Sequence, residues 1–161
     1  MGRRGAAIGS ALFFAVAPGV MAGLVPLVLT GWDAYEVPVP LRVIGGVVTA
    51  LGAAFLIQAF ARFVVEGLGT PAPVAPPERL VVGGIYRWVR NPMYVAVTAT
   101  ILGQALLLGR IALVIYAGVF WALTASFVRW YEEPNLRRRF GTEYDEYLQA
   151  VPGWLPRRPH M

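Results

Sequence analysis

The chain has 161 residues, of which 57% are hydrophobic and only 14% are charged, and its mean hydropathy is +0.59. A soluble domain usually carries about 25% charged residues, so this composition predicts an integral membrane protein. The net charge of +5 comes from arginines that flank apolar segments, which favours membrane lipids over nucleic acid as partners. The lack of cysteine and the single histidine, His160, exclude disulfides, thiolate metal sites and a histidine-based metal site or base in the core.

Four apolar segments follow one another along the chain, and each is compared with the roughly 20 residues that cross a bilayer. They are residues 8–29, 39–68, 93–108 and 111–127. Pro18 and Pro26 are expected to kink the first segment, for which a cleaved signal peptide is the alternative. Only Gly109 and Arg110 join the last two segments, so these are predicted to form a tight antiparallel hairpin.

The expected organisation is a single membrane domain over residues 1–161, all-α, with about four transmembrane helices. Its parts are two spans in 1–68, a proline-rich connector and a motif in 69–92, the helical hairpin in 93–130, and a C-terminal segment in 131–158. The prolines exclude a helix in the connector. Apolar residues at near-helical spacing from Leu136 to Val151 predict an amphipathic helical segment on the membrane surface, broken at Gly141.

The distribution of arginine predicts the orientation. Ten arginines lie in the N-terminus, the connector and the C-terminal segment, whereas the loop at residues 31–40 has two acids and no base. By the positive-inside rule, both termini and the connector are cytoplasmic. We expect the protein in the inner membrane of a bacterium or archaeon. Arg62 and Glu66, near the inner end of the second span, are spaced for an ion pair.

Two groups of polar and aromatic residues lie where the last two spans meet the cytoplasm. They are Gly84–Tyr94, which reads GIYRWVRNPMY, and Arg129–Glu133, which reads RWYEE. The hairpin is expected to bring them together. Simpler explanations exist for each: arginines and aromatic rings anchor proteins at membrane boundaries, Asn91 and Pro92 suit the N-cap and first position of a helix, and Glu132 and Glu133 suit the start of the amphipathic helix.

The adjacent carboxylates Glu132 and Glu133 are harder to explain as structural residues alone. Two carboxylates are costly to desolvate where a span leaves the membrane, unless a cation or hydrogen-bond donors meet them. Arg90, Arg129 or an exogenous cation can fill that role.

Three stretches in order, GTPAP, GIYRWVRNPMY and EEPNLRRRFGTEYDEYLQAVPGWLPR, resemble the isoprenylcysteine carboxyl methyltransferase family and its relative phosphatidylethanolamine N-methyltransferase. The resemblance covers roughly residues 62–158. It implies a methyltransferase without a Rossmann fold that uses S-adenosylmethionine. The cofactor would be enclosed between the cytoplasmic ends of the last two spans and the C-terminal helices. The acceptor would be a lipid-like or small hydrophobic molecule reached from the bilayer.

Position by position, the resemblance implies cofactor contacts from a defined set of residues. They are Tyr86, Arg90, Asn91, Pro92, Tyr94, Glu132 and Glu133. Asn91 stands where stricter members of the family have histidine. An amide keeps donor and acceptor capacity but does not titrate, so the substitution is more compatible with cofactor binding than with a base at this position.

Methyl transfer from a sulfonium requires the nucleophile and the methyl group to be held in line, away from water. We expect Arg90 to orient a carboxylate acceptor and Glu132 or Glu133 to serve as base if the acceptor is an amine. Glu133→Gln is expected to weaken cofactor affinity, and Arg90→Lys to lower turnover. The alternatives are a non-catalytic membrane scaffold, which would bind no cofactor, and a small transporter, which would need ionisable residues at mid-bilayer.

Overall fold

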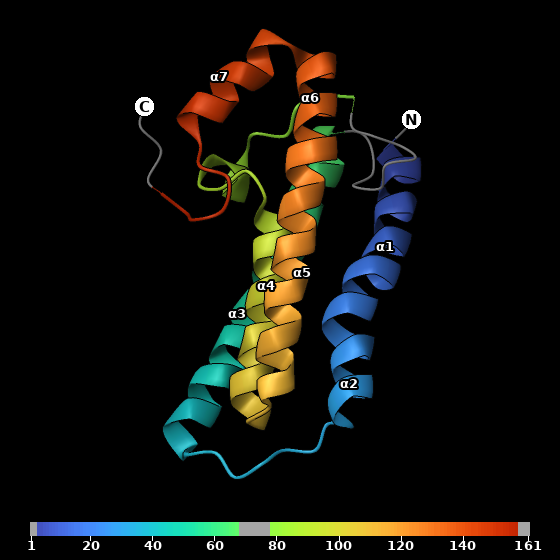
Figure 1. Cartoon of the computed structure of the whole chain (residues 1–161). Helices are drawn as coiled ribbons and strands as arrows, with labels where there is room; N and C mark the ends of the chain where they lie inside the picture. Colours follow the sequence, from blue (N-terminus) through green and yellow to red (C-terminus); the bar gives the residue numbers. More distant parts are fainter. Residues whose placement is uncertain (1–2, 68–77, 158–161) are drawn as a thin grey trace.

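The computed structural model describes residues 3–67 and 78–157, and all regular structure in these residues is helical. The helices are α1 (Arg3–Gly19), α2 (Val25–Thr30), α3 (Val39–Gly67), α4 (Pro92–Leu108), α5 (Ile111–Phe127), α6 (Glu133–Phe140) and α7 (Thr142–Ala150). Figure 1 shows an elongated molecule in which α3, α4 and α5 run along one another, with α6 and α7 at the end where α1 begins. The prolines of the connector lie outside the described residues.

The first predicted span is a continuous helix with an irregular middle. Between α1 and α2, residues Val20–Leu24 form a π-helical turn, so the irregularity lies between Pro18 and Pro26 and the chain is not broken at either proline. Two side chains hold this turn: Gln104 Nε2 donates to the carbonyl of Ala22 (2.7 Å), and Tyr116 Oη donates to the carbonyl of Met21 (2.8 Å). The first helix is therefore fastened to α4 and α5 at its π-helical turn.

Three helices among the described residues are long and apolar enough to cross a membrane: Ala11–Thr30, Val39–Glu66 and Ile111–Phe140. α4 is apolar but has only 17 residues. At 1.5 Å per residue it is about 25 Å long, which is less than the ~30 Å of a bilayer core. The prediction of an all-α membrane protein is confirmed. The third predicted span corresponds to α4, which is shorter than the three long apolar helices.

α3, α4 and α5 form the core of the bundle. The cluster that holds them together consists of Leu56, Phe60, Ala96, Val97, Ile101, Ala105, Leu108, Leu113 and Ala117. The predicted hairpin is confirmed, because α4 ends at Leu108, Gly109 follows as its C-cap with a positive φ of 67°, and α5 begins at Ile111, directly after Arg110. α3 and α4 approach so closely that the backbone of α4 lies against Gly45 of α3.

Because α3 and α4 approach closely at Gly45, one methyl group added there is expected to have a large effect on stability. A Cβ there would lie 2.4 Å from the backbone nitrogen of Leu107 and 2.7 Å from the carbonyl oxygen of Gly103. We expect Gly45→Ala to destabilise the protein by about 1–3 kcal/mol, as overpacking does elsewhere, measured as a lower midpoint of thermal unfolding in detergent. Gly118→Ala is the control, since nothing lies within 4 Å of its added Cβ. Equal midpoints for the two variants would contradict the packing.

α5 does not end where the C-terminal segment was expected to begin. It continues through a π-helical turn, Val128–Glu132, directly into α6 along one axis (Figure 1). Glu132 is the N-cap residue of α6 and Glu133 its first residue, as expected, but Glu132 has right-handed helical φ and ψ, so α6 continues the preceding helix. The break predicted at Gly141 is confirmed: its φ of 54° and ψ of −126° suit glycine, and α7 turns away after it.

Candidate functional site

The candidate site lies at the end of the bundle that carries α6 and α7 (Figure 1). The loop before α4 is fastened there to the last turns of α3. Tyr86 and Val81 are buried against Ala59 of α3, and the backbone nitrogen of Gly83 donates to Glu66 Oε2 (2.8 Å). The predicted ion pair of Glu66 with Arg62 is confirmed, at 3.2 Å. The loop that carries the motif is therefore held by the helix that precedes it.

A second segment, Val151–Arg157, lies alongside this loop, and we call it the C-terminal strap. The backbone nitrogen of Arg90 donates to Pro152 O (2.9 Å), and that of Asn91 donates to Gly153 O (3.2 Å). In the other direction, the nitrogen of Arg157 donates to the carbonyl of Trp88 (3.2 Å). Residues about 60 positions apart thus form one unit.

Arg90 connects the parts of this unit. Its Nε donates to the carbonyl of Val151 (2.9 Å), and its Nη1 donates to Glu133 Oε1 (2.9 Å) and, at 3.5 Å, to Tyr144 Oη. The side chain is only 13% exposed. The guanidinium therefore joins the strap, α6 and α7, and it neutralises one of the two adjacent carboxylates.

Asn91 and Pro92 have different roles at the start of α4. Pro92 is buried at the first position of the helix, as predicted. Asn91 occupies the N-cap position, as predicted, but its side chain makes no capping hydrogen bond. Its Nδ2 instead donates to the carbonyl of Gly153 at 3.0 Å. The side-chain amide of Asn91 is therefore bonded to the strap and does not cap α4.

Glu132 has a different partner from Glu133. Its Oε1 accepts a hydrogen bond from Tyr94 Oη at 2.5 Å, whereas its Oε2 makes no hydrogen bond within the described part of the chain. The ring of Tyr94 lies 6.4 Å from that of Trp154 in the strap, and Trp154 meets Trp121 of α5 edge-on at 5.7 Å. One carboxylate oxygen thus remains for a cation, next to Tyr94, the first of three successive aromatic rings.

Two tyrosines of α7 belong to the site, although sequence reasoning placed them only on the apolar face of an amphipathic helix. Tyr144 meets Arg90, and Tyr147 Oη donates to the carbonyl of Tyr86 (2.7 Å). Burial raises the pKa of Tyr86, Tyr144 and Tyr147 above the usual value. They therefore stay protonated at neutral pH. The spacing of the Tyr-x-x-Tyr pair, one helical turn, was the available signal.

The structure does not bring every predicted residue into this unit. Arg129 and Trp130 are exposed, and Arg129 makes no hydrogen bond or ion pair in the described part of the chain, so it does not neutralise the carboxylates. Trp88 is 44% exposed and Trp130 75% exposed. These residues fit the alternative of an anchoring belt at the membrane boundary.

Comparisons with known proteins match this chain to methyltransferases. Residues 41–143 match the family model described as phospholipid methyltransferase. The chain is also similar to protein-S-isoprenylcysteine O-methyltransferase B of Arabidopsis thaliana, with 35% identity over 79 residues, which are 48% of this chain and 40% of that protein. The protein-S-isoprenylcysteine O-methyltransferase of Schizosaccharomyces pombe is 35% identical over 81 residues, 50% of this chain and 34% of the relative. The matched part spans about two fifths or less of these relatives, both of which are eukaryotic.

Proposed function

Because the chain belongs to the phospholipid methyltransferase family, we propose that it transfers a methyl group from S-adenosylmethionine to a lipid-like acceptor at the inner face of the membrane. The family membership confirms the resemblance drawn from the motif, the Glu-Glu pair and the tail. The identity of the donor, the acceptor and the membrane face are parts of the proposal.

One observation carries the proposal: Glu132 and Glu133 are adjacent, and within the described residues an arginine neutralises Glu133 but not Glu132. This pair of carboxylates fits a cofactor that carries an ammonium and a sulfonium charge, since Glu132 keeps one carboxylate oxygen for a cation. When bound, S-adenosylmethionine supplies an activated methyl group. Glu132 would then provide the negative charge beside it, and Trp154 of the strap, whose ring lies 6.4 Å from that of Tyr94, would cover one side of Tyr94.

The hydrogen bonds that Arg90 makes to the strap and its neighbours determine the role that we propose for it. Its Nε and Nη1 are already bonded to the strap, Glu133 and Tyr144, so we assign Arg90 to positioning the walls of the site and no longer to orienting the acceptor. A carboxylate acceptor needs only to be aligned with the methyl group, whereas an amine has to lose a proton. In the second case Glu132 is the proposed base.

Charge at the two ends of the bundle supports the inner face as the location of the site. Arg90, Arg137 and Arg157 lie at the site end, whereas the opposite end has Arg42 and Arg110 together with Asp33 and Glu36. By the positive-inside rule, this distribution favours a cytoplasmic location for the site end, where α1 begins. The bacterial or archaeal inner membrane stays a prediction.

The test is calorimetric titration of the detergent-purified full chain with S-adenosylmethionine and S-adenosylhomocysteine. Transfer of a labelled methyl group is measured beside it, with N-acetyl-S-farnesylcysteine and phosphatidylethanolamine as acceptors. We expect both cofactor forms to bind and label to appear on one acceptor class. A folded protein that binds neither cofactor form would contradict the proposal and favour the scaffold alternative.

A further inference from the structure

A hollow of about 470 Å³ lies at the end of the bundle opposite the candidate site, and we call it the loop hollow. Its lining comes from the loop between α2 and α3 and from the start of α3: Glu36, Val37, Pro38 and Arg42. Figure 1 shows this loop crossing the end of the bundle that lies farthest from α6 and α7. The loop hollow therefore lies where the long apolar helix Val39–Glu66 begins.

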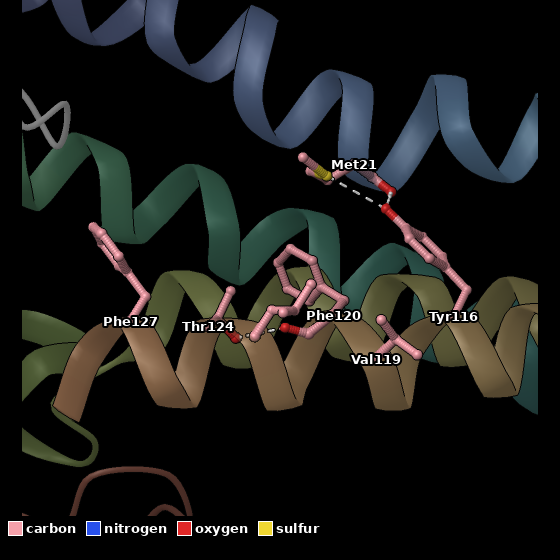
Figure 2. Close-up of a pocket in the computed structure, with 7 residues that line it drawn as sticks. Met21, Tyr116, Val119, Phe120, Thr124 and Phe127 are labelled. Carbon is pink, nitrogen blue, oxygen red and sulfur yellow. Dashed lines mark hydrogen bonds between the residues drawn. The ribbon is translucent and has the colours of Figure 1, made fainter. Parts of the chain in front are cut away.

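The loop hollow differs in chemistry from the hollow between the first helix and α5, which Figure 2 shows. That hollow is lined mainly by apolar side chains such as Phe120 and Phe127. The hydroxyl of its Tyr116 already donates to the carbonyl of Met21 (2.8 Å). The loop hollow instead has one carboxylate and one guanidinium in its wall. Of the two, it is the one that can select a charged ligand.

The two charged residues of the loop hollow do not neutralise each other. Within the described residues, no ion pair joins Glu36 to Arg42, and Glu36 makes no hydrogen bond. Arg42 donates from Nη2 to the carbonyl of Tyr35 at the long distance of 3.4 Å. Both charged side chains are exposed. A positive and a negative group thus line the same space, and each keeps hydrogen-bonding capacity for a ligand.

The loop that forms the wall is held in place although it has no regular structure. Arg110 donates from Nε to the carbonyl of Asp33 (2.9 Å) and from Nη2 to that of Thr30 (3.0 Å). Val37 packs closely against the end of α4, since a Cβ at Gly109 would lie 2.4 Å from its Cγ2. The wall is therefore formed before a ligand binds, which lowers the entropic cost of binding.

The surroundings of the loop hollow match the level of lipid headgroups. From the loop hollow along α3, Val39, Val43 and Val47 are 52–70% exposed, as is typical of a lipid-facing helix surface. Trp32 in the loop is 46% exposed, and tryptophan is enriched at membrane–water interfaces. A ligand whose charges lie in the loop hollow can therefore place hydrocarbon chains along α3.

We propose that the loop hollow binds the headgroup of a zwitterionic phospholipid, with its phosphate at Arg42 and its ammonium group at Glu36. Such a headgroup carries both charges that the wall complements, whereas an anionic lipid has no group for Glu36. The exposed valines that continue along α3 favour a phospholipid over a free zwitterion. This site is separate from the proposed methyl transfer, because α4, about 25 Å long, lies between them.

Lipid binding to the delipidated full chain in detergent tests the site. The probes are phosphatidylcholine, which is zwitterionic, and phosphatidylglycerol, which is anionic. The nitrogen of phosphatidylcholine is already fully methylated, so this lipid is not an acceptor at the candidate site. Native mass spectrometry over a range of lipid concentrations gives a dissociation constant for the first lipid bound. We expect phosphatidylcholine also to raise the midpoint of thermal unfolding.

Two charge-removing variants give opposite expectations for the two lipids. Glu36→Gln should weaken phosphatidylcholine binding by about threefold to fivefold, as for an exposed ion pair, without weakening phosphatidylglycerol binding. Arg42→Gln should weaken the binding of both lipids. The matched controls are Asp33→Asn, in the same loop but outside the lining and 84% exposed, and Arg129→Gln, exposed near the candidate site. Both controls should leave the dissociation constants unchanged.

Two results would overturn the inference. Equal losses in Glu36→Gln and Asp33→Asn would show that the overall charge of the protein determines lipid binding. Phosphatidylcholine binding that neither Glu36→Gln nor Arg42→Gln weakens would place the lipid elsewhere. Both residues are exposed, so the variants are expected to fold, and their unfolding midpoints without lipid check this. The outcome is independent of S-adenosylmethionine binding, so failure here leaves the proposed function standing.

Discussion

Replacement of Arg90 by lysine should lower methyl transfer roughly 30- to 150-fold, equivalent to about 2–3 kcal/mol. An ammonium group is a point donor and cannot keep the fork that bonds Val151, Glu133 and Tyr144 together. The loss is expected in kcat more than in cofactor affinity, because Arg90 positions the site walls. Steady-state kinetics with labelled cofactor measure both quantities.

A positioning role also predicts a change that kinetics do not report. When Arg90→Lys weakens the strap, trypsin should cleave faster at Arg157, whose backbone nitrogen is bonded to Trp88. Arg137→Lys is the matched control: this arginine also pairs with a carboxylate, Asp145, at 2.7 Å, but both partners are exposed. Unchanged cleavage together with unchanged kcat in Arg90→Lys would remove Arg90 from the mechanism.

Glu132→Gln should weaken S-adenosylmethionine binding by roughly 10- to 150-fold, since hydrogen bonds to charged groups contribute about 1.5–3 kcal/mol. Glutamine keeps an oxygen that can accept from Tyr94, so the change removes the charge and preserves the local packing. Calorimetry on the purified variant gives the dissociation constant directly. An unchanged constant would place the cofactor's positive charge elsewhere.

The neighbouring carboxylate provides the contrast. The sequence alone suggested that Glu133→Gln would weaken cofactor affinity, but Glu133 is already paired with Arg90 at 2.9 Å. We now expect Glu133→Gln to resemble Arg90→Lys, with slower turnover and faster cleavage at Arg157, and with a smaller loss of affinity than Glu132→Gln. The reverse order of affinities would exchange the two roles.

The sequence predicted the helices of the bundle closely because their ends carry strong local signals. Pro92 can begin a helix but not continue one, and Gly109 accepts the positive φ at which α4 ends. The long apolar runs between such signals define α3 and α5 within one or two residues. The π-helical turns at Val20–Leu24 and Val128–Glu132 were not predicted. The first of them is bonded by Gln104 and Tyr116 from other helices, contacts that no local pattern announces.

The site was predicted less completely, because some of its contacts join segments that are far apart in the sequence. Position in the hairpin was enough to place Tyr94 near Glu132, 38 residues away. The strap was missed, because irregular segments such as Val151–Arg157 have no periodicity, and their partners are backbone groups that any sequence supplies. Asn91 shows the consequence: a good N-cap residue by local preference, it bonds Gly153 instead.

The strap also constrains how the protein is made. Ribosomes release a chain from its N-terminus onward, so the helices of the described bundle are synthesised before residues 151–157 emerge. The bundle can then insert and pack while Arg90 and Asn91 still await the carbonyls of Val151 and Gly153, 61 and 62 positions later. The candidate site is therefore expected to be completed in the last folding step. Damage confined to the strap is expected to leave a bundle that inserts and packs but lacks the proposed activity.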